Sequence, residues 1–112
     1  MVVDYIPDRG DIIWIDFNPV MGHEQGGKRP AIVLSPRSYH VRSSLIIACP
    51  ITTKIKGYPF EVPIKTGKIN GVILADQVKT IDWRRRAISF EAKATTALQE
   101  VITKLSVLIG DL

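Results

Sequence analysis

The chain contains one cysteine and two histidines among its 112 residues, so the usual soft metal ligands are scarce. A single cysteine forms no internal disulfide. Cys49 stands among apolar neighbours, where we expect a buried, unreactive thiol rather than a nucleophile. His23 and His40 lie in polar stretches, where a surface side chain is the ordinary state, although a two-histidine ribonuclease pair has to be considered. We therefore expect no metal site and no cofactor.

Long hydrophobic runs are absent as well. The longest, such as LIIACPI at residues 45–51, fall far short of the roughly 20 residues that a membrane-spanning helix needs. The N-terminal MVVDYIPD lacks the basic and then apolar order of a signal peptide. These features predict a cytoplasmic protein with no membrane association. A chain of 112 residues, 46% of them hydrophobic, fits a single domain over residues 1–112.

The charge balance is mildly basic. Fifteen Lys and Arg against 11 Asp and Glu give a formal net charge of +4. Such a balance favours polyanions as partners, and RNA, DNA or an acidic protein segment would all fit. The basic residues that crowd the second half are Lys54, Lys56, Lys65, Lys68, Lys79 and residues 84–86.

Short stretches rich in β-forming residues recur along the chain, separated by turn residues. The stretch at residues 60–65 alternates with period two, which points Phe60, Val62 and Ile64 to the core, and Pro63 indicates an edge strand. Strands of this length and spacing predict a small β-barrel. The expected strands cover residues 11–17, 31–34, 45–51, 60–65 and 72–75, with one or two more in 80–90; residues 18–29 and 52–59 are predicted loops, 67–71 a hairpin turn and 37–44 a short helical turn.

The C-terminal segment changes to helical spacing, which makes the fold mainly β with α (α+β). Thr96 and Gln99 are spaced as a capping box, Glu100 pairs with Lys104 at i, i+4, and Gly110 ends the helix. The pattern predicts an amphipathic helix packed on the barrel. Its apolar positions are Leu98, Val101, Ile102, Leu105, Leu108 and Ile109.

The segment GHEQGGKRPAIVLSP at residues 22–36 holds the groups best suited to chemistry. It is no phosphate loop, because no Gly-Lys-Ser/Thr follows and the next element is a predicted strand. The Arg29 guanidinium can clamp a phosphate, and Glu24 stands nearby in sequence. Thr52 and Thr53 follow another strand and offer hydroxyl donors. Together these groups would suffice for metal-free attack of a ribose 2′-OH on its phosphate, but composition alone favours a surface ion pair and a turn cap.

Two further features stay ambiguous at this level. The arginines at residues 84–86 form either a solvated face or a strand that turns Arg84 and Arg86 to one side. The aromatic residues either stack RNA bases or, more commonly, fill the core. These aromatic residues are Trp14, Tyr58, Phe60 and Trp83.

Three blocks, in order and spanning nearly the whole chain, resemble the MazF/PemK family of bacterial toxins. They are YIPDRGDIIWIDFNPVMGHEQGGKRPAIVLSP at residues 5–36, CPITTKIKGYPFEV at 49–62 and GVILADQVKTIDWRRR at 71–86. The resemblance implies a CcdB/MazF-type barrel related to SH3-like folds, forming a homodimer. It implies sequence-specific, ribosome-independent and metal-free cleavage of single-stranded mRNA, which leaves a 2′,3′-cyclic phosphate and a 5′-hydroxyl and arrests growth.

The family motifs also assign site residues. By this resemblance Arg29 is the catalytic cation, Thr53 holds the scissile phosphate, and Glu24 is a base or substrate contact. Some family members carry histidine where this chain has Lys28, an ammonium that stabilises charge but is a poor base at neutral pH. The residues expected to bind substrate are Lys28, Thr52, Lys56, Gln77 and Lys79.

The resemblance further implies an inhibitor of the MazE type, whose acidic tail would compete with RNA for the basic surface. Contact with operator DNA would occur only through that antitoxin. Trp14, Lys79 and residues 84–86 are the expected contact points. The alternative is a CcdB-like toxin that poisons DNA gyrase by protein binding through its terminal helix. The apolar residues 107–110, which we expect to pack within the chain, argue against that alternative.

Overall fold

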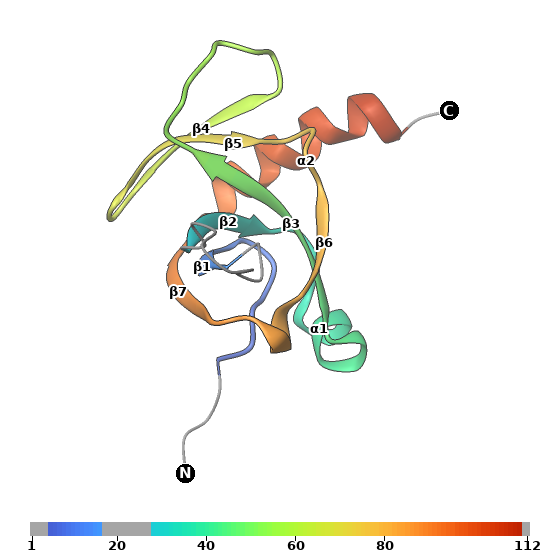
Figure 1. Ribbon diagram of the computed structural model, residues 1–112. Helices are drawn as coiled ribbons and strands as arrows, with labels where there is room; N and C mark the ends of the chain where they lie inside the picture. Colours follow the sequence, from blue (N-terminus) through green and yellow to red (C-terminus); the bar gives the residue numbers. More distant parts are fainter. Residues whose placement is uncertain (1–4, 17–27, 111–112) are drawn as a thin grey trace, which may run out of the picture.

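The computed structural model describes residues 5–16 and 28–110 and forms one curled sheet with a long helix packed on it (Figure 1). No helix in these residues is long and apolar enough to cross a membrane. The elements are β1 (Asp11–Ile15), β2 (Arg29–Val33), α1 (Arg37–Ser43), β3 (Leu45–Thr52), β4 (Glu61–Thr66), β5 (Ile69–Leu74), β6 (Lys79–Asp82), the 3₁₀ turn η1 (Trp83–Arg85), β7 (Ile88–Lys93) and α2 (Thr95–Ile109).

The strands form an antiparallel half-barrel, which confirms the predicted fold class. Their order is β4-β5-β3-β2-β1-β7, and β6 pairs with β3 beside this path. The long strand β3 can pair with both β6 and β5 along the same edge, because its first half pairs with β6 and its last residues pair with β5. Strand β4 lies at an edge, as Pro63 predicts, and its exposed proline alternates with buried Val62 and Ile64.

The core lies on both faces of the central strands. In β1 the neighbouring residues Ile12 and Ile13, both fully buried, belong to different clusters, as the period of two requires. The cluster around Ile12 includes Val101 of α2 and the fully buried Cys49. Burial raises the pKa of the Cys49 thiol to about 12, so this thiol is the inert group that its sequence context predicts.

Helix α2 occupies the predicted place, but three sequence-based details of it are wrong. Its N-cap is Ala94, with no side-chain cap, so the capping box does not form. Lys104 Nζ donates to the carbonyl oxygen of Pro59 at 2.7 Å rather than pairing with Glu100. The apolar residues at its end are exposed, with Leu108 50% and Val107 74% accessible, because the helix runs beyond the sheet.

Several boundaries also differ from the predictions. Arg29 and Thr52 belong to strands rather than loops, since Arg29 pairs with Ile15 and Thr52 with Val72. The turn expected at residues 67–71 is shorter, because β5 already begins at Ile69.

His40 is fully buried, so the predicted surface side chain is wrong. Its Nδ1 lies 2.7 Å from the carbonyl oxygen of Pro7, which only accepts, so Nδ1 carries the hydrogen. Its Nε2 then accepts from the Ser35 hydroxyl at 2.6 Å, and Ser35 Oγ accepts from the Ile47 amide at 2.9 Å. This chain of hydrogen bonds fits a neutral imidazole and ties α1 to the sheet.

The burial of His40 makes stability depend on pH. Burial lowers the pKa of His40 below its ordinary value, so the unfolded chain takes up a proton at a higher pH than the folded chain does. We expect the free energy of unfolding to fall as the pH drops below about 6.5. Urea denaturation between pH 7.5 and 5.5 measures this dependence, and His40→Asn should flatten it. An equal slope in the variant would contradict the assignment.

Candidate functional site

The start of β2 and the end of β3 meet at one side of the sheet. The antiparallel pairing of Ala31 with Pro50 brings these two strand ends together. Gly71 of β5 allows the close approach there, because a Cβ on it would lie 2.2 Å from the Thr52 carbonyl oxygen. The first cavity at this junction has a volume of about 260 Å³ and is lined by Trp14, Arg29, Pro30, Ile51, Thr52, Thr53, Lys54, Lys68 and Ile69.

The lining of this first cavity suits a phosphate. Arg29, Lys54 and Lys68 are exposed cations, and Thr53 adds an exposed hydroxyl. None of the described lining residues carries a carboxylate. A guanidinium and a hydroxyl facing one space can hold the oxygens of a phosphodiester and offset the charge that develops on them.

A second cavity of about 150 Å³ adjoins the first, since both include Thr52 and Lys54; together we call them the cleft. Lys56 Nζ lies 5.8 Å from the centre of the Tyr58 ring, and Tyr58 is 61% exposed. An exposed aromatic ring beside cations can stack an unpaired base. The residues lining the second cavity are Thr52, Lys54, Lys56, Tyr58, Glu61, Leu74 and Gln77.

Glu61 is a cleft residue that the sequence does not single out. Its side chain is buried, and its carboxylate accepts hydrogen bonds from the amides of Lys56 at 3.0 Å and Gly57 at 2.9 Å. These bonds shape the loop after Thr53 that carries Lys56 and Tyr58. Residue 61 precedes buried Val62 in β4, and successive side chains of a strand point to opposite faces, so periodicity alone predicts that the Glu61 side chain points outward.

The structure brings five predicted site residues together in the cleft and leaves two outside it. Lys28 and Lys79 are exposed but line neither cavity. Glu24 and His23 lie outside the described residues. The five that line the cleft are Arg29, Thr52, Thr53, Lys56 and Gln77.

Some of the four aromatic residues fill the core, and others line the cleft where they could stack bases. Trp83 is buried in the core, and its indole donates to the His40 carbonyl at 3.1 Å. Phe60 is partly buried. Trp14 is also partly buried but lines the first cavity, and Tyr58 lines the second.

The arginines at residues 84–86 belong to no strand, so of the two alternatives the strand is excluded; Arg84 and Arg85 are exposed and Arg86 is partly buried. They lie in and after η1, whose start is capped by Asp82 accepting from the Arg84 amide. Arg84 packs over the Trp83 ring at 5.1 Å, and Arg85 pairs with Asp82 at 3.4 Å. Arg86 Nη1 donates to the carbonyl oxygen of Asp16 at 2.7 Å, which fastens η1 to the end of β1.

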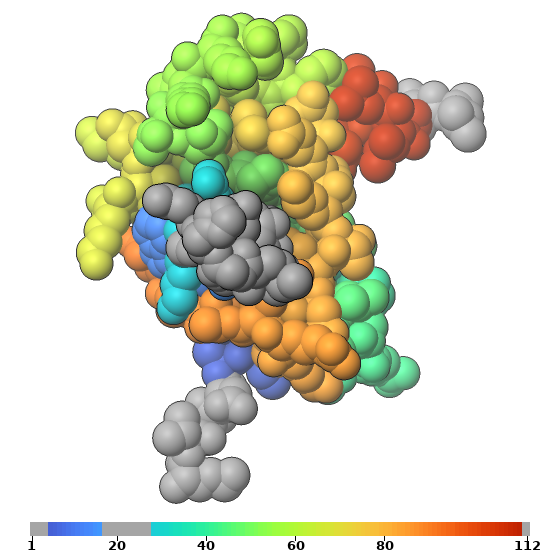
Figure 2. Space-filling model, viewed as in Figure 1, coloured from blue at the N-terminus to red at the C-terminus, as the bar shows by residue number. Residues whose placement is uncertain are grey.

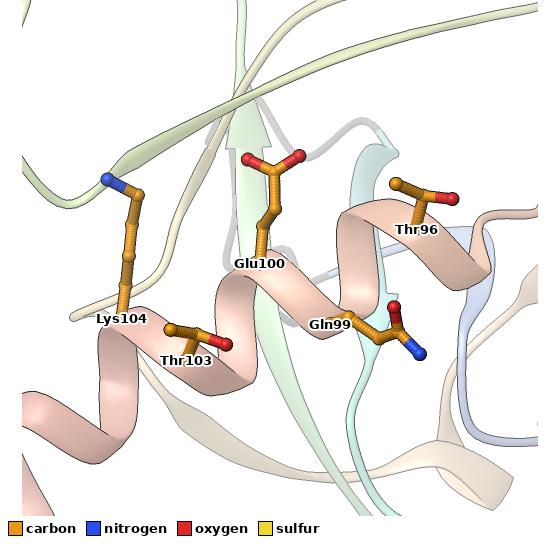
Figure 3. Close-up of a pocket in the computed structure, with 5 residues that line it drawn as sticks. All are labelled: Thr96, Gln99, Glu100, Thr103 and Lys104. Carbon is orange, nitrogen blue, oxygen red and sulfur yellow. The ribbon is translucent and has the colours of Figure 1, made fainter.

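A larger hollow of about 360 Å³ lies along α2 (Figure 3). Among residues 5–16 and 28–110, α2 alone lines it, and Glu100 and Lys104 project from that helix as separate side chains (Figure 3). No strand residue is among the described residues that line this hollow, in contrast to the cleft. The lining residues are Thr96, Gln99, Glu100, Thr103 and Lys104.

Fold and cleft together define a small half-barrel protein with a cationic cleft. The family model of the PemK-like, MazF-like toxin of type II toxin-antitoxin system matches residues 8–109. The chain belongs to this toxin family.

Named relatives agree with this assignment. The chain is 50% identical over 113 residues to the endoribonuclease toxin MazF of Escherichia coli K12, covering 98% of this chain and all of that protein. It is 31% identical to the endoribonuclease toxin ChpB of the same organism, covering 91% of this chain and 93% of that one. A crystal structure of MazE-MazF from Deinococcus radiodurans superposes with a TM-score of 0.89 at 47% identity, covering 97% of this chain and 100% of that one.

Proposed function

We propose that this endoribonuclease toxin cleaves single-stranded mRNA at a short sequence, without a metal ion or the ribosome, and thereby arrests growth. The observation that carries the proposal is the meeting of Arg29 and Thr53 in one cavity flanked by Lys54 and Lys68. The relatives named above are endoribonucleases. Because the proposed substrate is mRNA, we expect the protein to act in the cytoplasm.

The proposed reaction uses the nucleophile of the substrate itself. The ribose 2′-oxygen loses its proton and bonds to the adjacent phosphorus, the bond to the 5′-oxygen breaks, and that oxygen takes up a proton. The products are a 2′,3′-cyclic phosphate and a 5′-hydroxyl. Arg29 stabilises the charge on the phosphate oxygens, and Thr53 donates a hydrogen bond to one of them. Glu24 is the proposed base or substrate contact.

The rest of the cleft would bind the strand on either side of the scissile phosphate. Lys56 and Thr52 contact backbone phosphates, and Gln77 offers an amide that can read a base edge. Lys28 and Lys79 extend the basic surface beyond the cleft. Tyr58 and Trp14 are the rings on which unpaired bases stack.

The direct test incubates the purified chain with a long, defined RNA in EDTA and maps the cut positions and the fragment ends. We expect cuts at one recurring short sequence, with cyclic-phosphate and 5′-hydroxyl ends. RNA that stays intact with folded, antitoxin-free protein would overturn the proposal. Cleavage only after a divalent ion is restored would overturn the metal-free chemistry.

The proposed inhibitor is a MazE-type antitoxin with an acidic C-terminal tail. Solved structures of similar chains include a MazE-MazF assembly, and the cations of the cleft would attract acidic side chains as well as phosphates. Tail and RNA would then compete for the same surface, with Trp14, Lys79 and residues 84–86 as contact points. Operator DNA is bound only through the antitoxin.

We also propose that the chain forms a homodimer in which the end of α2 is covered by the second copy. Leu98 and Val101 pack on the core, but Leu108 and Ile109 continue the same apolar stripe into solvent, 50% and 70% exposed. This exposure corrects the expectation that residues 107–110 pack within one chain. The packing of residues 107–110 therefore no longer argues against a gyrase poison. The endoribonuclease function is favoured instead by the similar proteins, which are named endoribonuclease toxins.

A further inference from the structure

Glu91 stands where β7 departs from regular pairing with β1. Ile12 lies opposite Ala92, and the next residue, Ile13, lies opposite Phe90. Glu91 is therefore the extra residue of a β-bulge. A bulge bends its strand and re-aims one side chain, and bulges recur beside active sites.

The re-aimed carboxylate of Glu91 joins two separate parts of the chain. Its Oε1 accepts from the indole Nε1 of Trp14 at 2.9 Å, and its Oε2 accepts from the backbone amide of Lys68 at 3.4 Å. Trp14 belongs to β1, and Lys68 lies in the turn between β4 and β5. Both residues line the first cavity beside Arg29 and Thr53.

The turn at residues 67–68 leaves space for the Glu91 carboxylate, because residue 67 is a glycine. Gly67 has φ +51°, and a Cβ on it would lie 2.2 Å from Glu91 Oε2. The absence of a side chain at residue 67 thus leaves the space that the carboxylate occupies. The hairpin of β4 and β5 reaches across to the side of the molecule where β1 and β7 lie (Figure 1), and Figure 2 shows this hairpin, in yellow, beside the blue segment that contains β1.

We propose that Glu91 is a positioning residue that clamps Trp14 and the Gly67–Lys68 turn in place as two walls of the RNA cleft. The proposal rests on the proposed function, because it takes the cleft as the RNA site. The hydrogen bond from Trp14 is the main cause that lowers the pKa of the Glu91 carboxyl, so the group is charged at neutral pH. It therefore accepts both hydrogen bonds as an anion.

A clamp of this kind acts on binding more than on chemistry. The Glu91 carboxylate bonds to Trp14 and to the Lys68 amide, which line the first cavity, but Glu91 itself is not among the described residues that line it. Glu91→Ala should therefore raise KM for RNA about 3- to 10-fold and leave kcat within about twofold. Glu91→Gln replaces one of the two accepting oxygens with an NH2 group, which cannot accept from Trp14 or from the Lys68 amide, so it should give an intermediate KM.

The experiment combines RNA cleavage kinetics with NMR of the folded chain. In Glu91→Ala we expect the Trp14 indole hydrogen and the Lys68 amide hydrogen to shift and to exchange faster with solvent. Glu100→Ala removes an exposed carboxylate on α2 outside the cleft and is the matched control, expected to change neither readout. In a Trp14→Phe background, which lacks the indole donor, Glu91→Ala should raise KM by a smaller factor than in the native chain.

The outcomes separate the two proposals. Unchanged Trp14 and Lys68 resonances in Glu91→Ala would overturn the clamp. Shifted resonances with an unchanged KM, or a loss confined to kcat, would overturn its role in positioning the cleft walls. If the native chain cleaves no RNA, the proposed function fails, and the two resonances alone decide whether the clamp exists.

Discussion

Replacing Arg29 with alanine is expected to lower the RNA cleavage rate by about 10³-fold while the chain stays folded. The guanidinium is exposed in the first cavity, so its removal leaves no buried partner unsatisfied. What is lost is the cation that offsets charge on the phosphate oxygens as the 2′-oxygen attacks. Single-turnover cleavage of a short RNA containing the mapped sequence measures the effect.

Arg29→Lys is the matched control for this experiment. It keeps a positive charge but loses the planar pair of donors, so its rate should fall between those of the native chain and Arg29→Ala. Circular dichroism and the thermal midpoint should match the native chain in both variants. Cleavage by Arg29→Ala within about tenfold of the native rate would remove Arg29 from the proposed mechanism.

Replacing Leu108 with glutamate is expected to convert a dimer into a monomer. The side chain is 50% exposed in the single chain and continues the stripe through which Leu98 and Val101 pack on the core. A charge at a buried apolar contact between two copies is left without a partner and opposes association. Light scattering coupled to size-exclusion chromatography reports the molar mass at several protein concentrations.

The control for this experiment is Thr103→Glu, which adds the same charge on the polar side of α2. We expect it to keep twice the mass of one chain, as in the native protein. Leu108→Glu should run at the mass of one chain with an unchanged circular dichroism spectrum. A native protein that is monomeric at every concentration, or a dimeric Leu108→Glu, would contradict the proposed interface.

The elements that follow from local pattern are the ones the sequence predicts best. The alternation around Pro63 predicts an edge strand, and the spacing of Leu98 and Val101 predicts the helix. His40 shows the limit of such reasoning. It lies in a largely polar stretch, but in the folded chain Pro7 and Ser35 come to its ring, where they satisfy both ring nitrogens of the buried side chain.

Some residues of the cleft are predictable from the sequence and others are not. Family motifs indicate Arg29 and Thr53, and the structure brings both into one cavity. Glu61 and Glu91 have no such signal, because their roles depend on a loop turning back and on a one-residue shift in strand register. A bulge has no compositional signature that would identify it from sequence, so a contact between residues 14 and 91 is out of reach of periodicity.

The pairing of β1 with the late strand β7 has a consequence for when the cleft is complete. The first cavity gathers Trp14, Arg29, Thr53 and Lys68 from segments far apart in sequence, and Glu91 of β7 bonds to Trp14. Pairings over such distances close late and slowly in folding, because loop entropy is lost before the contacts form. Since β1 pairs with both β2 and β7, a chain still emerging from the ribosome lacks one of its sheet neighbours. Glu91 therefore holds Trp14 only after β7 has been made, which leaves an interval in which an inhibitor can meet the toxin as it folds.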